Sequence, residues 1–354
     1  MKMQRLCLGA VALAALANAA SAQSQVQIFG IVDVALTNIT NGSAGSVTGL
    51  TSGQASTSRL GFRGEEDLGG GWKAGFWLEG QVNVYNGTGG STGFDFQRRS
   101  TISLIGPYGE LRMGREQVPT YLNWGAYDLW GYVGVATTAN LRGRFLGLGD
   151  ASTGVRTSNT IAYWTPVFRG FSGHFMMAAD EGDTSASRTS DKYTGGSVAY
   201  KAGKFQASAA IGKTHKIGTM LDDLTTKNLG ASYDFGPVYV VAAYEKSEYS
   251  TRNRDLTTLG VRVPFGAGRF KAQYAKASGF GTTSIPQMYD AKLLGVGYDY
   301  SLSKRTRLYF NYGSIDNDGT TVTGANYTAT SNGPSGIRRG ETSSGYQFGV
   351  RHTF

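Results

Sequence analysis

The chain has 354 residues, with 34 lysines and arginines against 25 acidic residues and a formal net charge of +9. No cluster of basic residues accompanies this charge, so we do not expect nucleic-acid binding. After residue 22, no apolar run approaches the roughly 20 residues that a membrane-spanning helix needs, which excludes a helical membrane bundle. The 52 glycines, 17 phenylalanines and 20 tyrosines instead suit a β-barrel with aromatic girdles.

The N-terminus has the pattern of a secretory signal peptide over residues 1–22. A short basic segment is followed by the apolar run Leu6–Ala20 and by the small-residue cleavage site Ala20-Ser21-Ala22. An uncleaved membrane anchor is the alternative, but an apolar run of about 15 residues is short for a span. We therefore expect one mature domain, residues 23–354, which contains no cysteine because the only one, Cys7, lies in the signal.

The last strand of the chain shows a period of two most clearly. Apolar or aromatic side chains occupy every second position, and polar or small residues lie between them. This period predicts a β-strand with one apolar and one polar face. Because charged residues are tolerated on one face only, we expect the apolar face to meet lipid and the polar face a water-filled lumen. The apolar set is Tyr346, Phe348, Val350, His352 and Phe354.

The same alternation predicts an all-β fold, a transmembrane antiparallel β-barrel of sixteen strands. Short turns alternate with long polar loops, and an even strand count places both termini on the short-turn rim, where the last strand can pair with the first. A soluble β-sandwich, the alternative, would have to bury the charged residues of the polar faces. The expected strands are Val26–Thr37, Ser58–Glu65, Trp72–Val84, Phe96–Ile105, Glu110–Arg115, Arg156–Thr165, Phe171–Ala179, Lys192–Lys201, Phe205–Thr214, Lys227–Phe235, Val238–Ser247, Asp255–Val263, Arg269–Ser278, Asp290–Ser301, Arg305–Ile315 and Ser344–Phe354.

One connection, Glu116–Val155, is about 40 residues long, far beyond the usual length of a loop. It contains several tyrosines and tryptophans, which favour burial. The lumen of a sixteen-strand barrel is wide enough to hold a folded loop. We therefore expect this third extracellular loop to bend into the lumen and narrow the channel. Its charged residues include Glu116, Asp128, Arg142, Arg144 and Asp150.

Three separated segments resemble the Gram-negative porin family, most closely its beta-proteobacterial branch. Arg59–Gly71 is similar to the second hairpin of these porins, Arg156–Gly170 to the segment after their constriction loop, and Arg351–Phe354 to their C-terminal assembly signal. The resemblance implies a homotrimer of sixteen-stranded barrels in the cell outer membrane. It also implies contacts with lipopolysaccharide, outer-membrane lipid and the barrel-assembly machinery, and a third loop whose carboxylates face wall arginines. The Pro-Glu-Phe-Gly stretch of the enterobacterial loop is absent from this sequence.

Alternate residues of a strand face the same side, and counting them in this way places many basic residues on the wall of the expected lumen. Lumen-facing cations outnumber lumen-facing carboxylates, and removing Lys2 and Arg5 with the signal leaves the mature chain at +7. Because wall charges of one sign bias permeation, we expect a channel for small anions and hydrophilic solutes with mild anion selectivity. Pairing of these arginines with lipid or with neighbouring carboxylates is the alternative. The expected wall residues are Arg59, Arg63, Lys73, Arg99 and Arg112, with Arg262, Arg269, Lys271 and Arg307 across the lumen.

Other functions find less support in the sequence. None of the three histidines, His174, His215 and His352, has an identifiable acid or nucleophile partner, so we expect no enzyme and no cofactor. The acidic run Glu65–Asp67 suits a solvated turn better than a metal site. A plugged barrel with an adhesive surface would suit the long Gly-, Ser- and Thr-rich loops, but the chain contains no separate plug domain.

Overall fold

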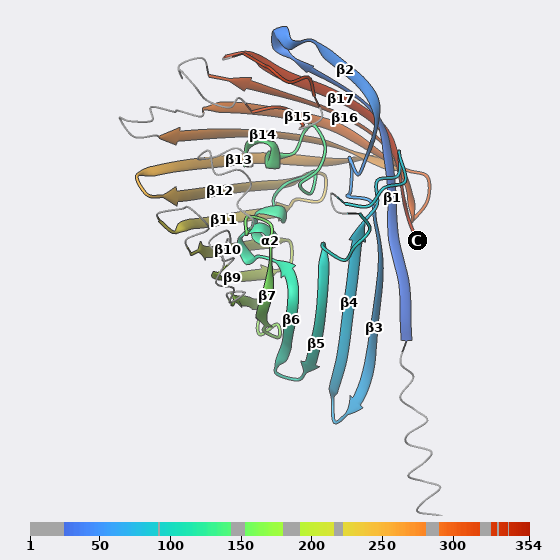
Figure 1. Cartoon of the computed structure of the whole chain (residues 1–354), viewed down its shortest axis with the longest axis vertical. Helices are drawn as coiled ribbons and strands as arrows, with labels where there is room; N and C mark the ends of the chain where they lie inside the picture. The colour runs from blue at the N-terminus through green and yellow to red at the C-terminus, as the bar shows by residue number, and fades with distance from the viewer. Residues whose placement is uncertain are drawn as a thin grey trace, which may run out of the picture.

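The computed structural model describes residues 25–90, 93–142, 153–179, 192–215, 222–280, 290–318, 327–330, 333–338 and 340–354. The expected signal peptide, Arg144 and Asp150 lie outside these residues. The described part forms a closed, curved wall of antiparallel strands (Figure 1). None of its helices has the length and apolarity to cross a membrane.

Successive strands from β3 to β17 pair in order, β1 pairs with both β2 and β3, and the pairing of β17 with β1 closes the ring. The barrel predicted from alternation is therefore confirmed. The elements are β1 (Gln25–Asn41), η1 (Gly42–Ala44), β2 (Ser46–Ser52), β3 (Arg59–Gly69), β4 (Trp72–Gln81), β5 (Arg99–Gly106), β6 (Gly109–Gln117), α2 (Pro119–Gly125), η2 (Thr138–Leu141), β7 (Arg156–Trp164), β8 (Phe171–Ala178), β9 (Tyr193–Ala202), β10 (Phe205–Thr214), β11 (Leu224–Asp234), β12 (Tyr239–Tyr249), β13 (Arg252–Phe265), β14 (Gly268–Phe280), β15 (Ala291–Ser301), β16 (Thr306–Asn317) and β17 (Thr342–Thr353).

The second barrel strand is built from two segments. β3 pairs with the first half of β1, and β2 pairs with its second half. β2 and β3 together therefore make one barrel strand, and the described strands form a barrel of sixteen. Residues 53–58 form an inward bulge between them, in which the backbone N–H groups of Ala55 and Ser56 donate to Asp33 and Gly53 adopts a φ of +73°. The expected strands Val26–Thr37 and Ser58–Glu65 left Asn38–Thr57 between them as a loop. This prediction was wrong, because β1 continues to Asn41 and β2 forms within the expected loop. The bulge interrupts the alternation, and the outward side chains of β2 include serines and threonines that do not look like a lipid-facing row.

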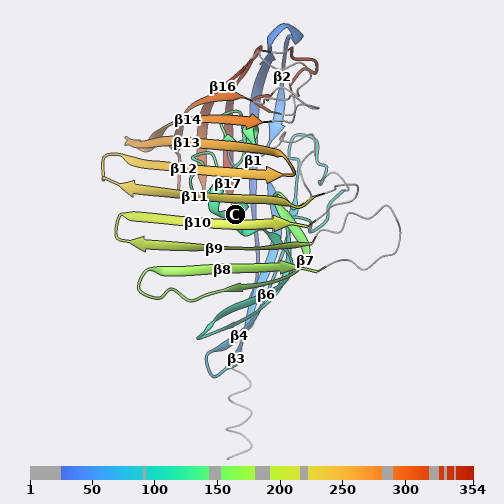
Figure 2. The same cartoon turned by 90° about the vertical axis from the view of Figure 1, so that its left-hand side faces the viewer.

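The two faces of the wall differ as predicted. On β17, Phe348 is 60% exposed on the outer face, whereas the neighbouring Gln347 is fully buried on the inner face. The final residue closes the barrel through two backbone hydrogen bonds of 3.1 Å between Gly30 and Phe354. Figure 2 shows tight turns such as β9–β10 and β11–β12 along one rim, the short-turn rim. The opposite rim, at which β4 and β6 end, is the long-loop rim.

Candidate functional site

A group of arginines lies on the inner face of β3 to β7. Arg59 begins β3, Arg99 begins β5 and Arg156 begins β7, so their side chains gather at one level of the wall. Arg112 projects from the middle of β6, and Arg98 lies immediately before β5. We call Arg59, Arg98, Arg99, Arg112 and Arg156 the arginine cluster.

Three glutamates pair with the cluster, and one of them, Glu110, accepts from Arg112 at 3.0 and 2.8 Å. Glu79 accepts from Arg98 at 2.6 Å and from Arg59 at 3.1 Å, and its second oxygen accepts from Trp77 Nε1 at 3.2 Å. Glu116 pairs with Arg112 and lies 3.7 Å from Arg99. Glu79 and Glu116 are almost fully buried and less exposed than the arginines with which they pair.

Aromatic rings fix the guanidinium planes. Arg99 lies over the Trp77 ring at 4.5 Å, and Arg112 over the Trp164 ring at 4.8 Å. The other face of Trp164 stacks on the imidazole of His174, with ring centroids 3.7 Å apart. Stacked guanidiniums keep their charge while losing little rotamer freedom, so these arginines are pre-ordered.

Two recesses meet at Trp77, Arg99 and Arg112. The first, about 250 Å³, includes the whole arginine cluster and extends to Leu122 on α2; the second, about 420 Å³, runs toward the short-turn rim past Arg63 and Glu65. Six arginines and four glutamates line the two recesses together. The path along this wall therefore has a formal excess of two positive charges.

Residues 118–142, which we call the inner segment, occupy the opposite side of the lumen. They follow β6 and contain α2 and η2, and most of their aromatic side chains are buried. Inward-facing polar side chains on successive strands bind this segment. The bonds join Tyr127 to Ser208 of β10, Asn123 to Asn228 of β11, Leu129 to Gln273 of β14, Trp130 to Asn311 of β16 and Val135 to Gln347 of β17.

Wall glycines allow the close approach. A Cβ built on Gly230 would lie 2.3 Å from the Tyr127 ring, and one on Gly313 would lie 2.1 Å from the carbonyl oxygen of Val135. Any larger residue would push the inner segment toward the arginine cluster. Part of the high glycine content therefore belongs to the inner wall.

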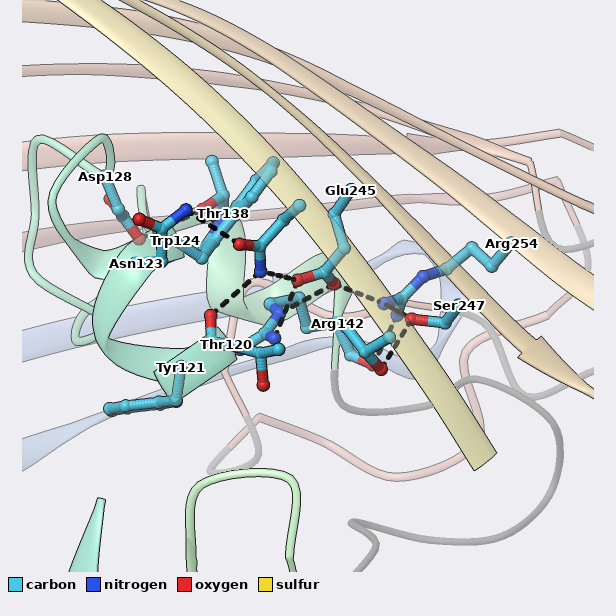
Figure 3. A network of polar contacts seen from close by, with 12 residues as sticks. Thr120, Tyr121, Asn123, Trp124, Asp128, Thr138, Arg142, Glu245, Ser247 and Arg254 are labelled. Atoms are coloured by element: carbon cyan, nitrogen blue, oxygen red, sulfur yellow. Dashed lines mark hydrogen bonds and ion pairs between the residues drawn. The ribbon is translucent and has the colours of Figure 1, made fainter. Parts of the chain in front are cut away.

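The inner segment is fixed at its far end by an ion-pair network on β12 and β13 (Figure 3). Glu245 is fully buried and accepts from Arg142 at 2.9 and 2.7 Å and from Arg254 at 2.8 Å. Asn228 donates to the same carboxylate at 3.0 Å and to the Thr120 carbonyl at 2.8 Å, which links the network to α2. Burial alone would lower the pKa of Arg142, but the Glu245 carboxylate outweighs it and the pKa is raised. Arg142 thus remains charged.

The remaining polar groups of the inner segment serve its own fold. Asp128 accepts from the Trp130 backbone N–H at 2.9 Å and from the hydroxyls of Thr137 and Thr138. Burial raises the pKa of Tyr121 and of Tyr132, so both phenols are neutral at physiological pH. Their rings stack with centroids 3.9 Å apart.

A second basic group lies on β14 to β16. Lys271, Arg269 and Arg307 surround Asp299 at 3.2, 3.1 and 3.3 Å, and the ammonium of Lys271 lies 4.8 Å from the centre of the Trp130 ring. Three cations share one buried carboxylate. This group was placed on the lumen by strand parity, and the structure places it there.

The structure brings together only some of the residues expected to line the constriction. Arg59, Arg99, Arg112 and Glu116 meet in the first recess, although Glu116 belongs to the end of β6 rather than to the loop. Arg63 lines the second recess and donates to Gln27 at 2.9 and 2.8 Å.

Other expected residues lie elsewhere. Lys73 pairs with Glu65 near the short-turn rim, Asp128 faces the inside of its own segment, and Arg142 faces Glu245 instead of the recess. Arg98 was missed because parity within the expected strand Phe96–Ile105 places it on the face opposite to Arg99, whereas β5 begins only at Arg99. Arg156, the first residue of the expected strand Arg156–Thr165, was also missed. Both residues lie next to long connections, and this position was the one sequence feature that could have indicated a place near the constriction.

Comparisons with known proteins agree with this architecture. The sequence pattern described as Gram-negative porin matches residues 9–320. Outer membrane porin protein 32 of Delftia acidovorans is 38% identical over 361 aligned residues, covering 98% of each chain, and an outer membrane porin protein of Bordetella pertussis is 29% identical, covering 88% of this chain and 94% of its own. A solved structure, the anion-selective porin from Comamonas acidovorans, superposes with a TM-score of 0.82 at 37% identity, covering 94% of this chain and all of that one. The chain therefore belongs to the Gram-negative porin family.

Proposed function

We propose that this protein is an outer-membrane channel through which ions and small hydrophilic solutes diffuse, with a preference for anions. The observation that supports it best is the path between the inner segment and the arginine cluster, lined by six arginines and four glutamates. Fixed positive charge along a narrow aqueous path concentrates anions and repels cations. The similar porin from Comamonas acidovorans, described as anion-selective, supports the same preference.

The inner segment acts as the constriction in this proposal. Its hydrogen bonds to five strands and its ion pair with Glu245 keep it against one side of the lumen, and solutes pass on the other side. Hydrated solutes pass between charged walls, whereas apolar solutes would have to displace ordered water. The buried carboxylates neutralise part of the cluster, so the preference is mild.

The proposal includes the assembly and surroundings of the chain. Residues 1–22 are removed as a signal peptide, and the lipid-facing end of β17, terminating at Phe354, is read by the barrel-assembly machinery. The mature chain forms a homotrimer in contact with lipopolysaccharide and outer-membrane lipid. The proposal assigns it no catalytic role.

The reversal potential in a planar bilayer with a KCl gradient tests the proposal. Wild-type protein is expected to pass chloride more readily than potassium. A unit charge about 4 Å away changes the energy of an ion by about 1 kcal/mol in water, so replacing Arg59, Arg99 and Arg112 together by glutamine is expected to reduce the preference severalfold. Arg169→Gln, which alters an exposed arginine that lies over the Phe168 ring in the turn between β7 and β8, is the control. Clear cation preference in the wild type, or a bilayer that stays silent with folded protein, would refute the proposal.

A further inference from the structure

Two pairs of lysines lie directly opposite each other on the outer face of the barrel. Lys227 of β11 faces Lys246 of β12, and Lys276 of β14 faces Lys292 of β15. All four lie near the long-loop rim, and their side chains point away from the lumen, since the residues on either side of Lys276 are fully buried alanines. Like charges directly opposite on neighbouring strands are destabilising unless an anion lies between them.

The first pair has its anion within the chain. Glu248 lies 3.4 Å from Lys227 and 2.9 Å from Lys246. One carboxylate therefore bridges two ammonium groups, and this pair needs no external partner.

The second pair has no such carboxylate. Within the residues that the structure describes, neither Lys276 nor Lys292 forms a salt bridge. Asp316 lies opposite Lys292 on β16 but forms no salt bridge with it, and one of its carboxylate oxygens accepts from the Thr342 hydroxyl at 2.8 Å. Two adjacent ammonium groups on the outer face are thus available to an anion.

The surface next to this pair is apolar. Tyr274 and Leu294 are the next outward-facing residues away from the rim, and their exposed fractions are 45% and 50%. The apolar row continues along β15 to Tyr300. The eight residue steps from Lys292 to Tyr300 span about 27 Å along the strand, or about 20 Å of height at the usual strand tilt. Because lysine side chains extend toward water, their ammonium groups lie near the edge of the apolar band, which is about 25 Å tall.

We propose that Lys276 and Lys292 form a clamp for a phosphate group of an acylated, phosphorylated glycolipid in the outer leaflet. The phosphate lies between the two ammonium groups, and the acyl chains cover Tyr274, Leu294 and the apolar row below them. The position at the long-loop rim selects the outer leaflet, since the long loops of such barrels are extracellular. This inference rests on the proposed outer-membrane location and gives the lipid contact a defined site.

Binding of diphosphoryl lipid A in mixed detergent micelles tests the clamp. Each lysine near an anionic lipid headgroup contributes about fivefold, so Lys276→Gln with Lys292→Gln is expected to weaken binding about 30-fold. The matched control, Lys227→Gln with Lys246→Gln, is expected to weaken it no more than about fivefold, because Glu248 already neutralises one of those charges. Lys276→Arg with Lys292→Arg is expected to bind as tightly as the wild type.

Three outcomes would overturn the clamp. The first is an equal loss of lipid A binding in the two double variants, and the second is unchanged binding in Lys276→Gln with Lys292→Gln. The third is binding of phosphatidylglycerol that is as tight as that of lipid A and depends on the same two lysines. Conductance and reversal potential of the same preparations are expected to stay at wild-type values, because the lysines face away from the lumen. A preparation that binds lipid A through Lys276 and Lys292 but forms no channel would refute the proposed function and leave the clamp intact.

Discussion

Replacing Glu245 by glutamine tests how the inner segment is held. The carboxylate is fully buried and accepts four hydrogen bonds, two from Arg142, one from Arg254 and one from Asn228. Glutamine keeps the shape but removes the charge and turns one acceptor into a donor. Two buried guanidiniums then lack their counter-ion, which typically costs about 3–5 kcal/mol. The equilibrium that holds the segment on β12 is expected to weaken by roughly two to three and a half powers of ten.

Hydrogen exchange measures this effect locally. Amide exchange within residues 118–142 is expected to accelerate strongly in Glu245→Gln, while the paired amides of β14 to β16 keep their protection. Bilayer recordings of the same variant are expected to show larger current fluctuations, since the segment borders the conducting path.

Glu248→Gln provides a control on the same strand. Glu248 lies between two exposed lysines, and surface pairs contribute about 0–1 kcal/mol, so this variant is expected to exchange like the wild type. If both variants accelerated exchange equally, or if neither did, the network would not hold the segment and the reasoning would be refuted.

Three further predictions concern the wall, the cluster and the C-terminus. Gly313→Val is expected to displace the inner segment and change single-channel conductance, because the new Cβ would meet the Val135 carbonyl. Gly49→Ala is the control and is expected to leave conductance unchanged, because a Cβ at Gly49 meets nothing within 4 Å. Glu79→Gln is expected to raise anion preference in a KCl gradient, because it removes a negative charge that partly neutralises Arg59 and Arg98, and a shift toward cations would contradict the assigned path. Phe354→Ala is expected to lower the amount of folded protein in the outer membrane while leaving detergent refolding nearly unchanged, since its ring is 47% exposed; equal losses in both assays would assign it a purely structural role.

The barrel could be predicted from the sequence because lipid imposes a period of two on nearly every strand. The alternation of β17 specifies its two faces without knowledge of any partner strand. The start of the second barrel strand was lost because residues 53–58 bulge and break the period. Asp33 organises this bulge by accepting from the backbone N–H groups of Ala55 and Ser56, a contact between distant residues that no local pattern reveals.

The candidate site was predictable only in part. Strand parity places Arg59, Arg99 and Arg112 on the inner wall, because parity follows directly from the pleat. It does not say which carboxylate faces which arginine. Asp128 has the composition of a constriction carboxylate, yet nearby hydroxyls and a backbone N–H satisfy it inside its own segment. Such choices depend on the folded path of a long loop, which period and composition leave open.

The central claim is that water and anions pass between the arginine cluster and the inner segment. Since Cys7 is the only native cysteine, Ser103→Cys introduces the one thiol among residues 8–354, on the wall of the second recess. A charged, water-soluble thiosulfonate is expected to reduce the bilayer current of this variant, and an anionic reagent is expected to react faster than a cationic one of equal size. The same reagents on Ile102→Cys, which lies on the outer face, are expected to leave the current unchanged. A Ser103→Cys channel that is fully modified by mass yet conducts as before, or that reacts faster with the cationic reagent, would contradict the account.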